Sequence, residues 1–407
     1  MKYPIGIQSF EKVREEGYTY VDKTGDIFKL ASEGSYYFLS RPRRFGKSLL
    51  LSTMRAYFEG RRELFEGLAI AELEKDWVQY PVLYLDLNTS EYNNVESLQI
   101  RISQTMEQWE NQFGIESSND RSLPLRFETI IREISSTTGK KVVILIDEYD
   151  KPLLQTFDNE PLQAEYRSML KAFYGNLKSC DEFIRFAFLT RVTKFGKVSV
   201  FSDLNNLSDI SLLPQYADIC GITGEELRRT FAEPVKSLAA NNGITEDECY
   251  TRLAEYFDGY HFYPGSVGVY NPFSLLSTLK NQVFRDYWFE TGTPTILVNK
   301  LQHTNYNLDN ICTDKVAVSV LNSIDVMDSH PLPLLFQSGY LTIKDYDTRF
   351  GKYTLGFPNR KVEEAFSKLI TRHARSTTGQ CGSNSFFCRR RTGEKKNYNN
   401  ITKNIFR

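Results

Sequence analysis

The sequence has few of the features that mark several common classes of protein. Its six cysteines are scattered without a C-x-x-C pair, so it predicts neither a disulfide framework nor a zinc site and favours a reducing compartment. Its four histidines are too dispersed to form a metal triad. The N-terminus lacks the apolar core of a signal peptide, and no apolar run approaches the roughly 20 residues that span a membrane. We therefore expect a cytoplasmic protein that makes no membrane contact.

Charge is balanced over the whole chain but not at its end. The formal net charge of −1 gives no whole-chain case for binding nucleic acid or an anionic membrane. From Arg372 to Arg407, however, nine Lys and Arg residues stand against one acid, which leaves 41 basic and 50 acidic residues before them. The segment from about residue 376 is also poor in aliphatic residues and lacks periodicity. It cannot bury enough apolar surface to offset its ordering entropy, so we expect it to be disordered.

Apolar runs alternate with helical periodicity through the first half of the chain. Four runs predict buried strands, at residues 36–40, 81–88, 140–150 and 183–192. Two segments between them predict helices, at residues 94–114 and around 163–175. A short strand is expected at residues 18–21. This alternation predicts an α/β fold with a parallel sheet and helices on both faces.

The organisation changes after about residue 220. Residues 224–257 predict mainly helix, with Thr223 and Glu226 placed as a capping box. Residues 333–359 predict helix, turn, strand, tight turn and strand. That order suits the end of a winged-helix-like module, and it equally suits a helix and hairpin on another scaffold.

The stretch FLSRPRRFGKSLLLSTM (residues 38–54) looks like a phosphate-binding loop between a strand and a helix. Arg41 stands where the pattern G-x-x-x-x-G-K-[ST] has its first glycine, and Pro42 follows it directly. Gly46 would let the backbone approach a phosphate, Lys47 would supply charge, and Ser48 would supply a hydroxyl ligand for Mg²⁺. The residues expected to contact the nucleotide are Arg43, Arg44, Phe45, Gly46, Lys47, Ser48 and Leu49. Taken alone, the stretch fits either this loop or a helix N-terminus in a basic surface turn.

Two later strands end in residues that suit the same chemistry. Asp147 and Glu148 follow an apolar strand, where the first carboxylate would orient Mg²⁺ alongside Ser48 and the second would polarise the attacking water. Thr190 and Arg191 end the next strand, in the position of a sensor of the γ-phosphate or the water. A loop bearing the lysine, followed about a hundred residues later by the acidic pair, is the order of an additional-strand P-loop ATPase. This joint placement favours a nucleotide site over the basic turn.

Seven segments of the chain together resemble a known bacterial family, the AAA-ATPase-like family. The resemblance runs from about residue 3 to 370 and rests on PIGIQSFEKVREEGYTYVDKT, FLSRPRRFGKSLLLSTM, LIDEYDKPL, FSDLNNLSDIS, DGYHFYPGSVGVYNPFSLL, YWFETGTPT and FQSGYLTI. In that family R-P-R-R-F-G-K-S is the usual loop. The resemblance implies Lys47 and Ser48 at phosphate and metal, and Asp147 and Glu148 at metal and water. It also implies a sensor-region segment beginning at Thr190.

The end of the chain departs from the family pattern. Members of the family often continue into a PD-(D/E)XK nuclease-like domain, and no spaced acidic and lysine constellation for such a domain follows residue 370. We therefore expect no nuclease activity. The change in composition near residues 371–375 suggests a truncated or frame-shifted product. The alternative is an authentic basic tail that touches nucleic acid.

Together these observations predict a P-loop ATPase parallel sheet, followed by a helical region and a winged-helix-like module. The expected divisions are an ATPase domain at residues 1–220, a lid-like helical domain at 221–330, the winged-helix-like module at 331–371 and a basic tail at 372–407. The function expected is ATP binding with Mg²⁺-dependent hydrolysis. The alternative is a non-hydrolysing nucleotide switch or scaffold that engages DNA or a protein partner, through the module or the tail.

Overall fold

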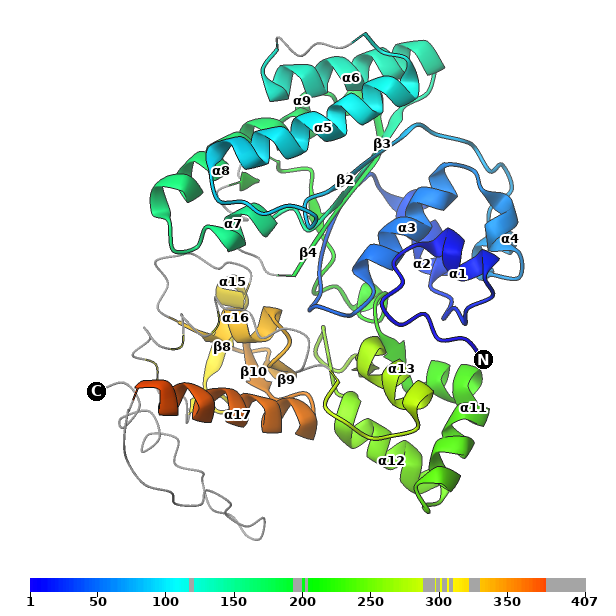
Figure 1. Cartoon of the computed structure of the whole chain (residues 1–407), viewed down its shortest axis with the longest axis vertical. Helices are drawn as coiled ribbons and strands as arrows, with labels where there is room; N and C mark the ends of the chain where they lie inside the picture. The colour runs from blue at the N-terminus through cyan, green and yellow to red at the C-terminus, as the bar shows by residue number, and fades with distance from the viewer. Residues whose placement is uncertain are drawn as a thin grey trace.

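A computed structural model of the chain shows a central parallel sheet with helices on both faces (Figure 1). It describes residues 1–116, 121–192, 200–201, 204–287, 297, 301, 306, 310–321 and 330–377, with side chains to residue 370. The five strands are β1 (Tyr36–Ser40), β2 (Val82–Asp86), β3 (Val142–Asp147), β4 (Ile184–Arg191) and β5 (Ser208–Asp209). They lie in the order β2-β3-β4-β1-β5, and all the pairs are parallel. The four strands predicted from apolar runs are confirmed.

Helices cover each face of the sheet, as the alternation of the sequence predicted (Figure 1). One face carries α1 (Phe10–Glu15), α2 (Thr24–Glu33), α3 (Lys47–Phe58) and α4 (Ala69–Leu73). The 3-10 turn η1 (Arg62–Phe65) connects α3 to α4. The other carries α5 (Val95–Phe113), α6 (Leu123–Thr138), α7 (Lys151–Gln155), α8 (Glu160–Tyr174) and α9 (Asn176–Ser179). The predicted strand at residues 18–21 is wrong. That segment is irregular, and its Thr19 N–H donates to Lys2 rather than to a strand of the sheet.

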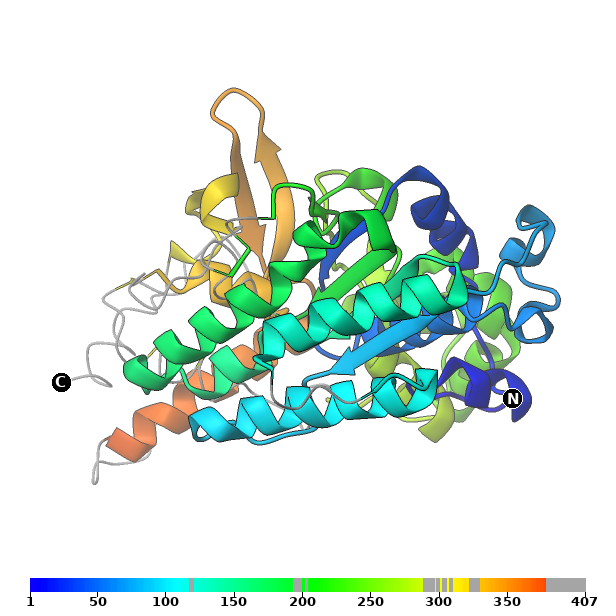
Figure 2. The same cartoon turned by 90° about the horizontal axis from the view of Figure 1, so that it is seen from above.

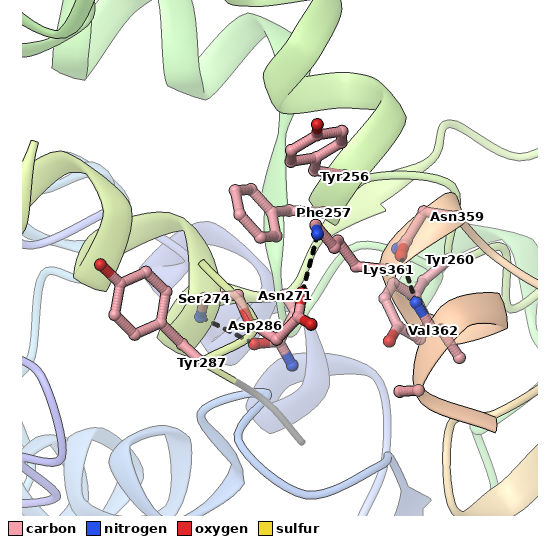
Figure 3. Close-up of a pocket in the computed structure, with 11 residues that line it drawn as sticks. Tyr256, Phe257, Tyr260, Asn271, Ser274, Asp286, Tyr287, Asn359, Lys361 and Val362 are labelled. Carbon is pink, nitrogen blue, oxygen red and sulfur yellow. Dashed lines mark hydrogen bonds and ion pairs between the residues drawn. The ribbon is translucent and has the colours of Figure 1, made fainter. Parts of the chain in front are cut away.

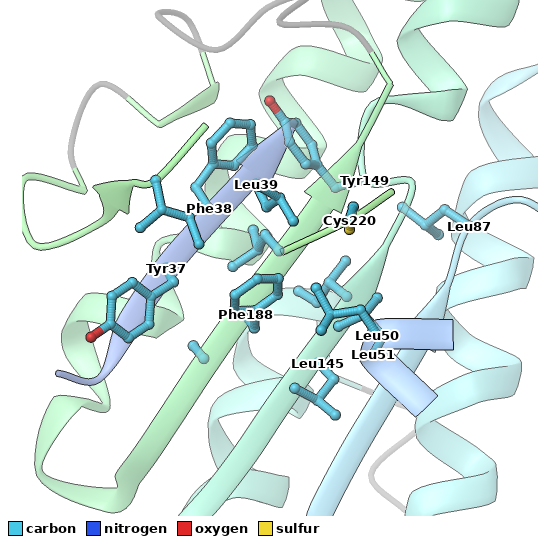
Figure 4. Close-up of a cluster of buried hydrophobic side chains, with 14 of the residues drawn as sticks. Tyr37, Phe38, Leu39, Leu50, Leu51, Leu87, Leu145, Tyr149, Phe188 and Cys220 are labelled. Atoms are coloured by element: carbon cyan, nitrogen blue, oxygen red, sulfur yellow. The ribbon is translucent and has the colours of Figure 1, made fainter. Parts of the chain in front are cut away.

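The strands covered on both faces are apolar except near their carboxyl ends and at Arg185 of β4, and their apolar side chains form the core beneath the site. Every residue of β1 and β3 is buried. Figure 4 shows Phe38 and Leu39 of β1, Leu145 of β3 and Leu51 of α3 gathered in one cluster. The short 3-10 turn η2 (Asp181–Phe183) directly precedes β4, and a second one, η3 (Pro214–Tyr216), follows β5. This rigid core fixes the positions of the strand ends, where the polar residues lie.

The helices that follow have a small core of their own. They are α11 (Gly224–Asn241), α12 (Glu246–Phe257) and α13 (Pro272–Asn281), with a short antiparallel pair of β6 (Ile222–Thr223) and β7 (Val269–Tyr270). The predicted capping box is confirmed, because the Glu226 N–H donates to the Thr223 hydroxyl and the Thr223 N–H donates to the Glu226 carboxylate. The apolar side chains of these helices form a cluster separate from the core of the sheet.

The last described elements form the winged-helix-like module. Its elements are β8 (Lys315–Ala317), α15 (Val318–Leu321), α16 (Leu332–Gln337), β9 (Thr342–Asp347), β10 (Lys352–Gly356) and α17 (Arg360–Thr377). The strands form an antiparallel sheet in the order β8-β10-β9. Figure 2 shows the β9–β10 hairpin, in orange, standing out from the body of the molecule. The core of this module is continuous with the core of the parallel sheet. The divisions at residues 220, 330 and 371 stay predictions, and the basic tail lies outside the described residues.

Candidate functional site: a phosphate-binding loop facing two carboxylates

The loop between β1 and α3 has the backbone shape of an anion-binding site. Arg44 has φ +69° and Gly46 has φ +92°, and Phe45 between them has no positive φ. Alternation of this kind turns successive backbone N–H groups toward one concavity. Gly46 is also the N-cap of the twelve-residue helix α3, whose first N–H groups have no partner within the helix. The loop therefore combines two features that favour a bound phosphate.

Lys47 lies inside this loop and is held by it. The side chain is 5% exposed, and its ammonium donates to the backbone oxygens of Arg41 at 3.1 Å and Pro42 at 3.3 Å. The carboxylate of Glu148 lies 3.4 Å from the same ammonium. The structure therefore brings the two residues together from opposite sides of the site, the lysine from the first turn of α3 and the acid from the end of β3.

Asp147 joins the loop to the neighbouring strand. Its buried carboxylate accepts hydrogen bonds from the hydroxyls of Ser48 and Thr190. Burial is the main cause that raises the pKa of Asp147, and the charge of Glu148 raises it further. The three residues come from α3, β3 and β4, and they meet because the carboxyl ends of parallel strands share one edge of the sheet. The arrangement places a carboxylate and two hydroxyls beside Lys47.

Glu148 sits at the tip of β3 in an unusual backbone conformation. Its φ of +52° is uncommon for a residue other than glycine, asparagine or aspartate. Strain of this kind costs about 1–3 kcal/mol and persists where the surrounding structure imposes it. Glu148 directly follows the buried end of β3, and in this conformation its carboxylate lies 3.4 Å from the Lys47 ammonium, with 15% of the side chain exposed. The carboxylate thus remains accessible at the mouth of the site.

Arg41, which replaces the usual first glycine, does not face the loop's concavity. The residue is 1% exposed, and its guanidinium donates to the carbonyls of Ser40, Ser211 and Tyr216 at 2.7–2.9 Å. The same group lies 3.9 Å from the centre of the Phe262 ring. Burial lowers the pKa of Arg41 to about 10, so the guanidinium stays charged at neutral pH. Arg41 therefore anchors the start of the loop from behind.

The remaining loop residues are placed differently from one another. Phe45 is 1% exposed and packs in the core, which leaves its backbone N–H as the group available to a ligand. Arg44 is exposed, with its guanidinium 4.5 Å from the centre of the Phe273 ring, and Arg43 is half-buried. Leu49 is half-buried and packs against the main core. Nucleotide contact by these residues stays a prediction.

Thr190 and Arg191 point to opposite faces of β4, as consecutive strand residues do. Thr190 reaches Asp147, whereas the Arg191 guanidinium lies 4.2 Å from the centre of the Phe38 ring and donates to the Tyr149 hydroxyl. Arg191 is fully buried, and burial lowers its pKa. Its role as a sensor stays a prediction. The sensor segment expected after it lies partly outside the described residues, at 193–199 and 202–203.

Sequence reasoning missed one acid at this edge of the sheet. Asp86 ends β2 and stands directly opposite Asp147 in the register of the two strands. Burial is the main cause that raises its pKa, and the charge of Glu148 adds to it. The signal that could have found Asp86 is its place at the end of the apolar run VLYLD. Three carboxylates thus lie along the tips of two adjacent strands.

A separate pocket lies away from this chemistry, between α12, α13 and α17 (Figure 3). Tyr256 and Tyr287 line it, and Lys361 pairs there with Asp286 at 3.0 Å. The side-chain nitrogen of Asn271 has no hydrogen-bond partner in the described part of the chain. The pocket shares no residue with the phosphate-binding loop, so we place the chemistry at the strand tips.

The fold and the site together define the class of protein. In the order β2-β3-β4-β1-β5, an extra strand separates the strand before the lysine loop from the strand that bears the acidic pair. A glycine–lysine–serine loop in this sheet defines an additional-strand P-loop ATPase fold. The family model described as "Predicted AAA-ATPase" matches residues 4–201. The chain belongs to this AAA-ATPase-like family, as the resemblance in its motifs predicted.

A relative from Azotobacter chroococcum mcd 1 supports the assignment along most of the chain. It is described as an uncharacterized protein in the vnfD 5′ region, and it is 38% identical over 374 residues. The alignment covers 91% of this chain and 70% of the relative. In the described part of this chain, no helix is both long and apolar enough to cross a membrane.

Solved structures that align with the chain are more distant, each at 11% identity. The ORC2 protein of Aeropyrum pernix, in ADPNP–ADP complexes, aligns with a TM-score of 0.38 over 88% of this chain and 96% of its own. CDC6P from Pyrobaculum aerophilum gives 0.28 over 88% and 94%. The Aeropyrum pernix ORC1 protein, in complex with DNA, gives 0.31 over 89% and 97%. At these scores the fold assignment rests on the strand order itself.

Proposed function

We propose that the chain binds ATP at the loop between β1 and α3 and hydrolyses its γ-phosphate with Mg²⁺. The observation that carries the proposal is the convergence of Lys47, Ser48, Asp147 and Glu148 at one edge of the parallel sheet. A lysine in a backbone anion site, with a hydroxyl and two carboxylates beside it, is the set of groups that phosphoryl transfer requires.

The two ends of the site have different tasks in this proposal. The backbone N–H groups at Arg44–Gly46 and the start of α3 hold phosphate oxygens, and Lys47 neutralises their charge. Lys47 already lies 3.4 Å from Glu148, so a bound phosphate would compete with that carboxylate for the ammonium. Released from the pair, Glu148 would accept a proton from a water molecule that attacks the γ-phosphate.

The donors present fit a magnesium ion that is bound together with a nucleotide. Ser48 and Asp147 offer hard oxygen ligands that already touch one another. In the described ranges no three His, Cys, Asp or Glu side chains group as a metal site, which fits an ion held largely by phosphate and water. When bound, the ion would neutralise charge that develops on the phosphate oxygens. A cation bound here would also stabilise the ionised form of the buried Asp147 carboxylate.

Steady-state phosphate release tests hydrolysis against the alternative of a non-hydrolysing switch, because both functions require binding. We expect the purified protein to release phosphate from ATP only with Mg²⁺, and Asp147→Asn to require a higher Mg²⁺ concentration. ATP binding without phosphate release would support the switch. An Asp147→Asn variant with the Mg²⁺ dependence of the parent would remove this residue from the metal site.

A second candidate function is contact with nucleic acid through the winged-helix-like module. The observation that favours it is the projecting β9–β10 hairpin (Figure 2). Arg349 and Lys352 of this hairpin are both exposed. Phosphate contacts from such residues give binding that weakens as salt rises. Duplex DNA binding should therefore weaken in an Arg349→Ala, Lys352→Ala variant. Binding equal to the parent at several salt concentrations would exclude the hairpin as the contact.

A further inference from the structure

Two side chains of the phosphate-binding loop pack against one short aromatic segment, residues 260–262. The Arg41 guanidinium lies 3.9 Å from the centre of the Phe262 ring. The Phe45 ring packs edge-on against Tyr260, at 4.8 Å between ring centres, and against Phe262, at 5.7 Å. Arg41, Phe45 and Tyr260 are each at most 2% exposed, and Phe262 is 6% exposed. Both ends of the loop therefore contact the Phe262 ring, and Phe45 also contacts Tyr260.

The same aromatic segment is fastened to the winged-helix-like module. The backbone N–H of His261, between the two rings, donates to the Thr342 hydroxyl at 2.6 Å, and that hydroxyl donates back to the His261 carbonyl at 3.0 Å. Arg41, Phe262 and the α16 residue Phe336 line one small pocket behind the loop. A continuous path of contacts thus runs from the loop to α16 and β9.

Close backbone packing holds this path at a second point. Gly259 has φ +87°, and a Cβ at this position would lie 2.2 Å from the carbonyl oxygen of Pro358. The Asn359 amide donates to the carbonyl of Asp258 at 2.8 Å. The segment can therefore shift relative to the module only if these contacts break, so a movement of either one is transmitted to the other.

The buried arginine explains how the loop opens without its usual glycine. Its fork of donors fixes three carbonyls from two parts of the chain, and the Phe262 face supports the guanidinium plane from one side. A buried contact of this type is among the stronger cation–π interactions. Because the Arg41 carbonyl also accepts from the Lys47 ammonium, a shift of Arg41 would move the lysine.

We propose that Arg41 and Phe262 are positioning residues that make the affinity of the loop for nucleotide depend on the winged-helix-like module. The role rests on the proposed nucleotide site and deepens it. Neither side chain faces the concavity; both act through the placement of Lys47 and the loop backbone. By reciprocity, nucleotide in the loop must change the module's contacts with the aromatic segment by the same free energy.

The test compares Phe262→Leu, which removes the aromatic face, with Phe262→Tyr, which keeps it. ATP affinity is measured by calorimetric titration, and native folding by thermal unfolding. We expect ATP binding about tenfold weaker in Phe262→Leu, with binding by Phe262→Tyr close to the parent. A matched control is Phe183→Leu, because Phe183 also lies under an arginine, at 4.7 Å, but in η2, just before the first residue of β4 and therefore at the opposite end of that strand from Thr190 and Arg191. This control should bind ATP like the parent.

Hydrogen exchange of the full chain gives a readout that simple packing would not change. ATP added to the parent should slow amide exchange at residues 336–343, and the effect should be lost in Phe262→Leu. Parent protein that binds ATP without any change there would overturn the coupling, even if the variant fails to fold. Equal ATP affinity in the parent, Phe262→Leu and Arg41→Lys would overturn the positioning role. If the parent binds no ATP, the proposed function itself fails.

Discussion

The pair formed by Glu148 and Lys47 leads to a prediction in which binding and turnover change in opposite directions. Glu148→Gln keeps the shape of the side chain and removes the carboxylate that lies 3.4 Å from the ammonium. At this distance two unit charges attract by about 5 kcal/mol at an effective dielectric constant of 20. Desolvation offsets most of that attraction, which leaves a net contribution of about 1 kcal/mol for a pair at the mouth of a site. That net energy is what a phosphate must overcome.

Removing this competition should tighten ATP binding by about fivefold. Losing the proton acceptor should lower turnover by about 10²–10⁴-fold. Calorimetric titration and steady-state phosphate release measure the two effects on the same preparation. Glu16→Gln is a suitable control, since Glu16 pairs with Lys12 at 3.9 Å on the surface. Turnover by Glu148→Gln equal to the parent would refute the role of Glu148, and weaker binding would refute the competition.

Three further predictions concern stability. Arg126→Met removes the partner that lies 2.6 Å from the buried Glu110 carboxylate, and should lower the free energy of unfolding in urea by about 3–5 kcal/mol. Adding Glu110→Leu should recover most of this loss, and a loss below about 1 kcal/mol for Arg126→Met would contradict the prediction. Burial, and then the charge of Asp218, raises the pKa of Asp26 to about 6, so the folded state holds this proton more tightly than the unfolded state. The free energy of unfolding should therefore fall as pH rises from about 4 to 6, and this part of the slope should vanish in Asp26→Asn. Gly259→Ala forces a Cβ against a backbone carbonyl at positive φ and should lower the thermal midpoint by several degrees, whereas an unchanged midpoint would argue against the close approach.

The site residues at the carboxyl ends of the strands could be predicted from the sequence because local patterns mark them. Both motifs can be recognised from consecutive residues alone. One is the apolar run that ends in Asp147 and Glu148, and the other is the glycine–lysine–serine motif before a helix. Parallel strands bring such ends to one edge of a sheet, so the chain order predicted that Lys47 and Glu148 lie close together. The same patterns predicted the hairpin and helix of the last module. Local periodicity was sufficient for these elements.

The roles of Arg41 and Phe45 depend on contacts that no local pattern records. In the sequence both belong to a basic loop, and either could face a phosphate. In the structure both are buried, because the rings of Tyr260 and Phe262, more than two hundred residues later, fill the space behind the loop. The prediction of a strand at residues 18–21 failed for a related reason. Tyr20 packs against Phe10 of α1, and Val21 packs against the cluster formed by the helices that follow the sheet.

The most direct test of the central claim is a titration of the intact chain with ATP, with and without Mg²⁺, beside the Lys47→Ala variant. The account predicts binding by the parent that strengthens with Mg²⁺, and binding by Lys47→Ala that is at least about tenfold weaker, since a charge-assisted contact to phosphate is lost. Thermal unfolding of both proteins confirms that each is folded. Equal affinity of Lys47→Ala and the parent for ATP, in both conditions, would contradict the account.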